Sequence, residues 1–205
     1  MDHNNQVNIV CNFVAEKTFS LLKDLKTLEL GPLDGWFTEQ LLKYTSDVTV
    51  IELGKGVCEL LSEKFNDQVK IIDDDFHYAI TNVGVFDAVV MFGVLYHSVS
   101  PFKLIEDTVN FCKPKYILLD CGGSDPNQPL LWGVEHSKQK GSRQYRNRSS
   151  GIVIDPGISS IKTAMSNLEY QLTEQIDLTE TELSQIPNWD FKQGFKVLVF
   201  KDTHL

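Results

Sequence analysis

Short apolar runs alternate with amphipathic segments along most of the chain. Apolar runs without polar alternation are typical of strands that are buried on both faces. Such runs lie at residues 28–30, 48–53, 69–72, 86–92 and 116–119. Segments with apolar residues at helical spacing lie between them, at 36–44, 57–65 and 102–111. This alternation predicts a doubly wound α/β fold, in which a mostly parallel sheet is covered by helices on both faces.

The two ends of the chain follow other patterns. Residues 1–26 contain a predicted helix at 7–25, which either closes over a ligand as a lid or packs on the sheet. After a helix at 158–168, strands at 170–178 and 196–201 follow each other without an intervening helix. We therefore expect an antiparallel hairpin at one edge of a seven-stranded, Rossmann-like sheet.

Residues 122–156 form a predicted insertion between these two parts. The segment is rich in Gly, Ser, Asn, Gln and Pro, and we expect it on the acceptor side of the site. Loops of this length in compact domains are usually functional lids or poorly ordered. Both interpretations remain open at this point.

Composition narrows the class of protein. The 205 residues suit one domain, 1–205, and 42% hydrophobic and 23% charged residues exclude a disordered or fibrous chain. No apolar run is long enough to span a bilayer, and Met1–Gln6 lacks the profile of a signal peptide, so we expect a cytoplasmic protein. The four cysteines form no CxxC pair and have no histidine at metal-ligand spacing, so we predict reduced thiols and no metal site.

The net charge of −9 argues against general nucleic-acid binding, which depends on neutralising phosphates. A local basic patch could still bind RNA. Five of the 19 basic residues lie within eleven positions of the insertion. Among them, Arg143, Arg146 and Arg148 are candidates to bind an anionic acceptor or an RNA backbone; the alternative is a solvated loop.

The end of the first strand is a candidate ligand loop, because open α/β sheets bind ligands beyond the carboxyl ends of their strands. Gly31 and Gly35 permit a tight turn and a close backbone approach, although a plain strand-to-helix turn would also use them. A dinucleotide fingerprint would need glycine at positions 33 and 36. The chain has Leu33 and Trp36 there, which disfavours a nicotinamide dinucleotide.

Acidic residues follow the next two strands. Glu52 stands 21 residues after Gly31, where a carboxylate can accept hydrogen bonds from both hydroxyls of a ribose; the alternative is a surface glutamate. The third strand ends in Asp73–Phe76, where one acid could bind an adenine amine beside the Phe76 ring. A solvated turn that caps the next helix is the competing explanation for at least one of these aspartates.

These segments, with Phe92–His97 after the fourth strand, resemble class I S-adenosylmethionine-dependent methyltransferases over roughly residues 28–119. Leu28–Gly35 is similar to the first motif of the family without its middle glycine. Asp75 and Phe76 stand where the family has its adenine-side acid and neighbour. The resemblance implies S-adenosylmethionine as cofactor, bound by Glu29, Gly31, Pro32, Gly35, Trp36, Glu52, Asp74, Asp75, Phe76, Phe92, Gly93 and Val94.

Methyl transfer from a sulfonium is an in-line displacement, so alignment of the reactants is the main task of the protein. Acidic and aromatic neighbours suit the positive sulfonium. If the acceptor must lose a proton, His97 is the candidate base and Tyr96 stands beside it; the alternative for His97 is a structural role.

The leading hypothesis is methyl transfer to oxygen or nitrogen of a small molecule. Gly93–Pro101 is especially similar to a bacterial group of small-molecule and tRNA-modifying methyltransferases. A tRNA-modifying methyl- or carboxymethyltransferase is therefore the second hypothesis. A non-catalytic relative that binds S-adenosylmethionine is the third. The sequence does not indicate an oligomeric state.

Overall fold

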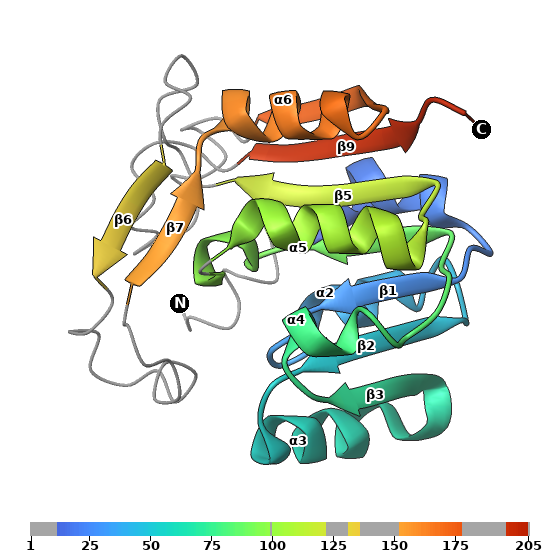
Figure 1. The fold of residues 1–205 in the computed structure, drawn as a ribbon. Coiled ribbons are helices and arrows are strands. Elements are labelled where there is room, and N and C mark those ends of the chain that lie inside the picture. The colour runs from blue at the N-terminus through green and yellow to red at the C-terminus, as the bar shows by residue number, and fades with distance from the viewer. Residues whose placement is uncertain (1–11, 99, 122–130, 136–151, 178–195, 205) are drawn as a thin grey trace.

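A seven-stranded sheet forms the centre of the computed structural model, which describes residues 12–98, 100–121, 131–135, 152–177 and 196–204. The strand order is β3-β2-β1-β4-β5-β9-β8 (Figure 1). The strands are β1 (Thr27–Leu30), β2 (Val48–Glu52), β3 (Val69–Asp73), β4 (Ala88–Met91), β5 (Tyr116–Cys121), β8 (Tyr170–Asp177) and β9 (Lys196–Asp202). Strands β1 to β5 are parallel, and β9 runs antiparallel to both β5 and β8. The predicted fold class and C-terminal hairpin are confirmed.

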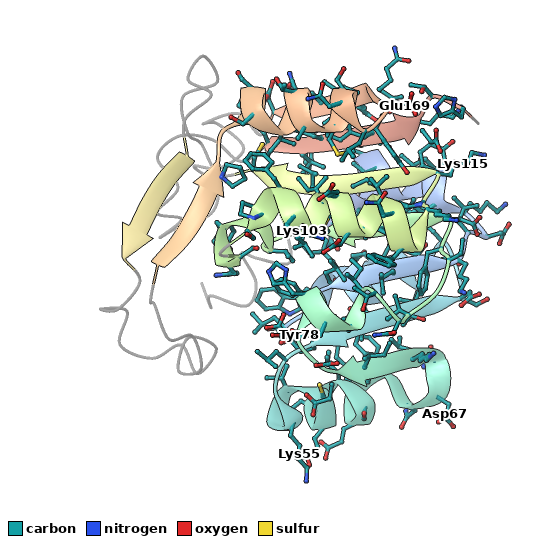
Figure 2. All side chains as sticks on the ribbon, viewed as in Figure 1. Lys55, Asp67, Tyr78, Lys103, Lys115 and Glu169 are labelled. Carbon is teal, nitrogen blue, oxygen red and sulfur yellow. The ribbon has the colours of Figure 1, made fainter. Side chains whose placement is uncertain are left out.

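Helices cover both faces of this sheet. On one face lie a helical segment at 12–18, a 3₁₀ turn η1 (Phe19–Leu22), α2 (Trp36–Leu41) and α3 (Lys55–Phe65). On the other lie α4 (Phe76–Ala79), α5 (Pro101–Asp107) and α6 (Ile158–Asn167). Figure 2 shows Tyr78 on α4 and Lys103 on α5, on the face opposite α2.

The alternating directions of strand side chains create two hydrophobic cores. Ala88 and Val90 of β4 face the first core, whereas Val89 and Met91 face the second. All four are fully buried, which explains why the sequence shows a continuous apolar run here and not a polar alternation.

The described part of the N-terminal helix packs against the first core. Val14, Phe19 and Leu22 are completely buried there. The predicted lid comprises residues 1–26, of which 1–11 lie outside the described residues.

The insertion contains secondary structure that the sequence analysis missed. Strands β6 (Leu131–Glu135) and β7 (Ile152–Pro156) pair antiparallel as a separate two-stranded ribbon. The ribbon lies beyond the carboxyl ends of the parallel strands (Figure 1). Strand β7 lies beside the 3₁₀ turn η3 (Leu95–His97) and α5. The prediction of 122–156 as a loop throughout is thus corrected for these strands.

Smaller differences concern element ends. The predicted helix at 102–111 is α5 followed by a π-helical turn, η4 (Thr108–Cys112). The bounds of the short helix α4 and of the turn η3 were not predicted, because four and three residues are too few to show a helical period. Within the described ranges, no helix has the length and apolar character needed to cross a bilayer.

Candidate functional site

The strand order reverses between β1 and β4. The chain proceeds outward from β1 to β2 and β3, and then returns to pair β4 with the other side of β1. In doubly wound sheets, ligands bind in the crevice at this switch point. Gly31 and Val94 meet there: a Cβ atom on Gly31 would lie 3.2 Å from Val94 Cγ2. Gly31 and Gly93 also have positive φ angles of 64° and 71°, so both turns favour glycine.

Glu52 connects the ends of the first two strands. Its Oε2 accepts a hydrogen bond from Leu33 N at 2.9 Å, and its Oε1 accepts one from Leu53 N at 2.9 Å. The residue is 5% exposed. Burial raises the pKa of Glu52 above its ordinary value, and the two backbone hydrogen bonds offset only part of this rise. Each carboxylate oxygen has a second lone pair, so the group can also accept hydrogen bonds from ligand hydroxyls.

Glu29 is a second buried carboxylate, close enough to Glu52 for their charges to interact. Thr38 of α2 donates its hydroxyl hydrogen to Glu29 Oε2 at 2.6 Å, and Glu29 is 3% exposed. The pKa of Glu29 is raised to about 7, mainly by burial. The hydrogen bond from Thr38 and the charge on Lys64 oppose this rise, whereas the charge on Glu52 adds to it. Glu29 therefore connects β1 to α2 and titrates near neutral pH.

The loop between β1 and α2 is held from a second side by α3. Lys64 Nζ donates a hydrogen bond to Asp34 O at 3.1 Å and lies 3.2 Å from Glu39 Oε2. Gly35 has a φ angle of 77°, and a Cβ atom there would lie 2.5 Å from the Phe65 ring. Glycine at this position thus serves both the turn and the close approach of α3. Beside it, Pro32 is buried, and Trp36, half-buried, begins α2.

The aspartates after β3 have different local roles. Asp73 Oδ1 accepts a hydrogen bond from Gly54 N at 3.1 Å, and Asp74 Oδ1 accepts one from Asp75 N at 2.8 Å. Asp75 Oδ1 accepts from His77 N at 2.9 Å and caps α4. The helix-capping explanation therefore applies to Asp75, although its carboxylate retains lone pairs for a ligand. Phe76 is half-buried and packs against the second core.

Two bonds that the sequence analysis missed connect these loops to their neighbours. The Ser98 Oγ and His77 Nε2 atoms are 2.9 Å apart, which joins the loops after β3 and β4. Asp120, at the end of β5 and 5% exposed, accepts a hydrogen bond from Gly93 N at 2.8 Å through Oδ1. Asp120 could have been found by the rule that identified Glu52, since both are acids at the end of a buried run.

Of the residues that follow β4, some lie in the first core and others lie at the edge of the sheet. The Phe92 side chain packs in the first core, with ring centroids 6.1 Å from Phe19 and 4.8 Å from Phe37, and it is 6% exposed. Only its backbone is thus available at the edge. Tyr96 and His97 are half-buried on η3, with ring centroids 4.1 Å apart.

The structure therefore gathers the predicted residues from β1 to β4 at one edge of the sheet. The exceptions are the Phe92 side chain, which faces the core, and the three predicted acceptor-binding arginines, Arg143, Arg146 and Arg148, which lie outside the described residues. Within the described part of the chain, no cluster of three metal-ligating side chains occurs.

Residues 7–104 match the family model of ribosomal RNA adenine dimethylases. The matched segment is a little under half of the 205 residues and includes strands β1 to β4. No curated protein sequence matches the chain.

Solved structures share the fold at low sequence identity. The N-terminal domain of EvdMO1, solved with S-adenosylhomocysteine and D-fucose, is 20% identical with a TM-score of 0.66, over 94% of this chain and 82% of that chain. The 1,6-didemethyltoxoflavin-N1-methyltransferase of Burkholderia thailandensis is 11% identical with a TM-score of 0.69, over 98% and 80%. The magnesium protoporphyrin IX methyltransferase of Synechocystis, solved with S-adenosylmethionine, is 10% identical with a TM-score of 0.62, over 98% and 79%.

Proposed function

We propose that this chain is a class I S-adenosylmethionine-dependent methyltransferase and that it methylates an oxygen or nitrogen atom of a small-molecule acceptor. The strand order, the family match and the fold of the solved structures confirm the predicted resemblance. The acceptor class and the roles of individual residues belong to the proposal.

The observation that carries the proposal is that the ends of strands β1 to β4 lie along one edge of the sheet. Glu52 presents a carboxylate with lone pairs suited to ribose hydroxyls, and Gly31 and Gly93 keep Cβ atoms out of the crevice. Asp74 and Asp75 lie after β3, where an adenine amine needs an acceptor. These groups fit an adenosine-containing donor.

S-adenosylmethionine, when bound, supplies a methyl group already activated by the sulfonium. The residues of the chain then have to hold the donor and align it with the acceptor. Glu52 orients the ribose, and the carboxylate of Glu29 lowers the potential around the positive sulfonium when it is ionised. Alignment of this kind contributes on the order of 7–11 kcal/mol to lowering the barrier.

The acceptor would approach from the side of η3 and the ribbon. Strand β7 lies beside η3, which carries Tyr96 and His97. An acceptor hydroxyl or ammonium must lose a proton, and His97 Nδ1 or Nε2 would take it. The net charge of −9 favours a small molecule over a polyanion as acceptor.

Turnover tests the proposal directly. Incubated with S-adenosylmethionine and a panel of small hydroxyl and amine compounds, the protein should release S-adenosylhomocysteine only when an acceptor is present. Mass spectrometry of the acceptor should show a gain of one methyl group. Tight binding of S-adenosylhomocysteine without release on any acceptor, small molecule or RNA, would identify a non-catalytic relative instead.

RNA is the second candidate acceptor, favoured by the match to ribosomal RNA adenine dimethylases. Under this alternative the basic segment would bind phosphates. Changing its three arginines to glutamine should then abolish salt-dependent binding of tRNA or ribosomal RNA fragments and leave the affinity for S-adenosylhomocysteine unchanged. The variant combines Arg143→Gln, Arg146→Gln and Arg148→Gln.

The matched control removes three exposed positive charges elsewhere, with Lys17→Gln, Lys23→Gln and Lys43→Gln. Both variants change the net charge equally, so a loss of RNA binding in both would reflect charge alone. RNA binding that is absent from the parent, or insensitive to salt, would exclude this alternative.

A further inference from the structure

Leu33 has a left-handed backbone, with a φ angle of 56°. Among the described residues, five non-glycine residues have positive φ. Four of them, Asp24, Asn66, Lys113 and Glu169, stand one or two residues after the last residue of a helical segment, where this conformation is common. Leu33 instead follows a strand, and leucine is disfavoured in this region by contact between its Cβ atom and the backbone.

Packing in the core does not compensate for this unfavourable backbone. The Leu33 residue is 47% exposed, and neither hydrophobic core of the described residues includes it. Glycine would adopt the same backbone without strain. A side chain that brings strain and little burial is best explained by a contact made only when a ligand is present, since strained residues concentrate at ligand sites.

The position of Leu33 indicates which part of a ligand it meets. Leu33 N donates to Glu52 Oε2 at 2.9 Å, and Leu53 N donates to Oε1 of the same carboxylate at 2.9 Å. Leu53 is 39% exposed. Two exposed leucines thus flank the one carboxylate assigned to the ribose. A hydrogen-bond acceptor held by the backbone amides of two residues with exposed apolar side chains matches a nucleoside, whose sugar hydroxyls lie next to an apolar ring face.

We propose that the Leu33 side chain forms an apolar contact with the nucleoside half of the donor and sets the affinity of the site for adenosine ligands. This inference rests on the proposed function. The same side chain occupies the position where a dinucleotide site has glycine, so it would also exclude a pyrophosphate.

The test compares Leu33→Asn and Leu33→Gly with the parent chain. Asparagine and glycine both tolerate the left-handed backbone, so neither variant should have a lower Tm. Calorimetry measures binding of S-adenosylhomocysteine and of 5′-methylthioadenosine, which lacks the amino-acid part. We expect both ligands to bind about tenfold more weakly to each variant, from the apolar area left uncovered.

The pattern of losses separates the proposals. Unchanged affinity in both variants overturns the role of Leu33 and leaves the proposed function standing. A loss for S-adenosylhomocysteine alone also overturns it, because the contact would then lie on the amino-acid half. A parent chain that binds neither ligand overturns the proposed function itself. A lower Tm with unchanged affinity would indicate a structural role and reject the inference.

Discussion

Glu52→Gln is expected to weaken binding of S-adenosylhomocysteine by at least about 100-fold, since hydrogen bonds to a charged partner contribute roughly 1.5–3 kcal/mol each and two ribose hydroxyls lose that partner. The variant also loses an acceptor for one of two backbone donors, Leu33 N or Leu53 N. The chain should remain folded, because burial already disfavours the charged form of Glu52. Calorimetry with S-adenosylhomocysteine measures the effect.

Glu63→Gln is the matched control, because Glu63 is exposed on α3 and its loss of charge should not change the affinity. If Glu52→Gln binds S-adenosylhomocysteine as tightly as the parent chain, the assignment of Glu52 to the ribose is wrong. The carboxylate would then serve only to hold the Leu33 loop.

Glu29→Gln is expected to increase the free energy of unfolding strongly at pH 8 and only slightly at pH 5. Burial raises the pKa of Glu29 from its ordinary 4.5 to about 7. The folded state then binds the proton more tightly than the unfolded state, so the stabilisation is complete below pH 4.5 and is lost as pH rises through about 7. The difference corresponds to about 3 kcal/mol.

Glutamine imitates the protonated carboxyl group at every pH and can still accept the hydrogen bond from Thr38. Urea denaturation of parent and variant at pH 5, 6.5 and 8 measures the effect. Because Glu52 and Lys64 also act on Glu29, the curves should be compared with those of Glu63→Gln, which removes one exposed carboxylate from α3. Equal stability of Glu29→Gln and the parent chain at pH 8 would contradict the raised pKa.

The sheet, and the position of the loops that follow its parallel strands, were predictable because they depend on periodicity. Near-continuous apolar runs such as 88–91 can be buried on both faces only in a sheet covered by two helix layers. The rule that ligands bind at the carboxyl ends of such strands then directed attention to Gly31, Glu52 and Gly93, which the structure brings to one edge.

Side-chain direction at the end of a strand was not predictable. Phe92 follows the last residue of β4, and its position in the sequence is compatible with either the crevice or the first core. Phe92 lies in the first core because its ring packs against the rings of Phe19 and Phe37, which both belong to other segments. The contact between His77 and Ser98 likewise depends on loops that are 21 residues apart. Sequence spacing alone does not predict side-chain contacts of this kind.

The order of strands along the chain has a consequence for how acceptor specificity can diverge. All proposed donor residues come from one uninterrupted stretch, Glu29 to Val94. The ribbon and the β8–β9 hairpin come from residues after 121, and β9 joins the sheet by pairing with β5. A chimera that keeps everything through β5 and takes its remaining segments from another protein of this fold would therefore keep all of the proposed donor residues. Such a chimera would separate donor binding, which should be kept, from acceptor specificity, which should follow the exchanged segments.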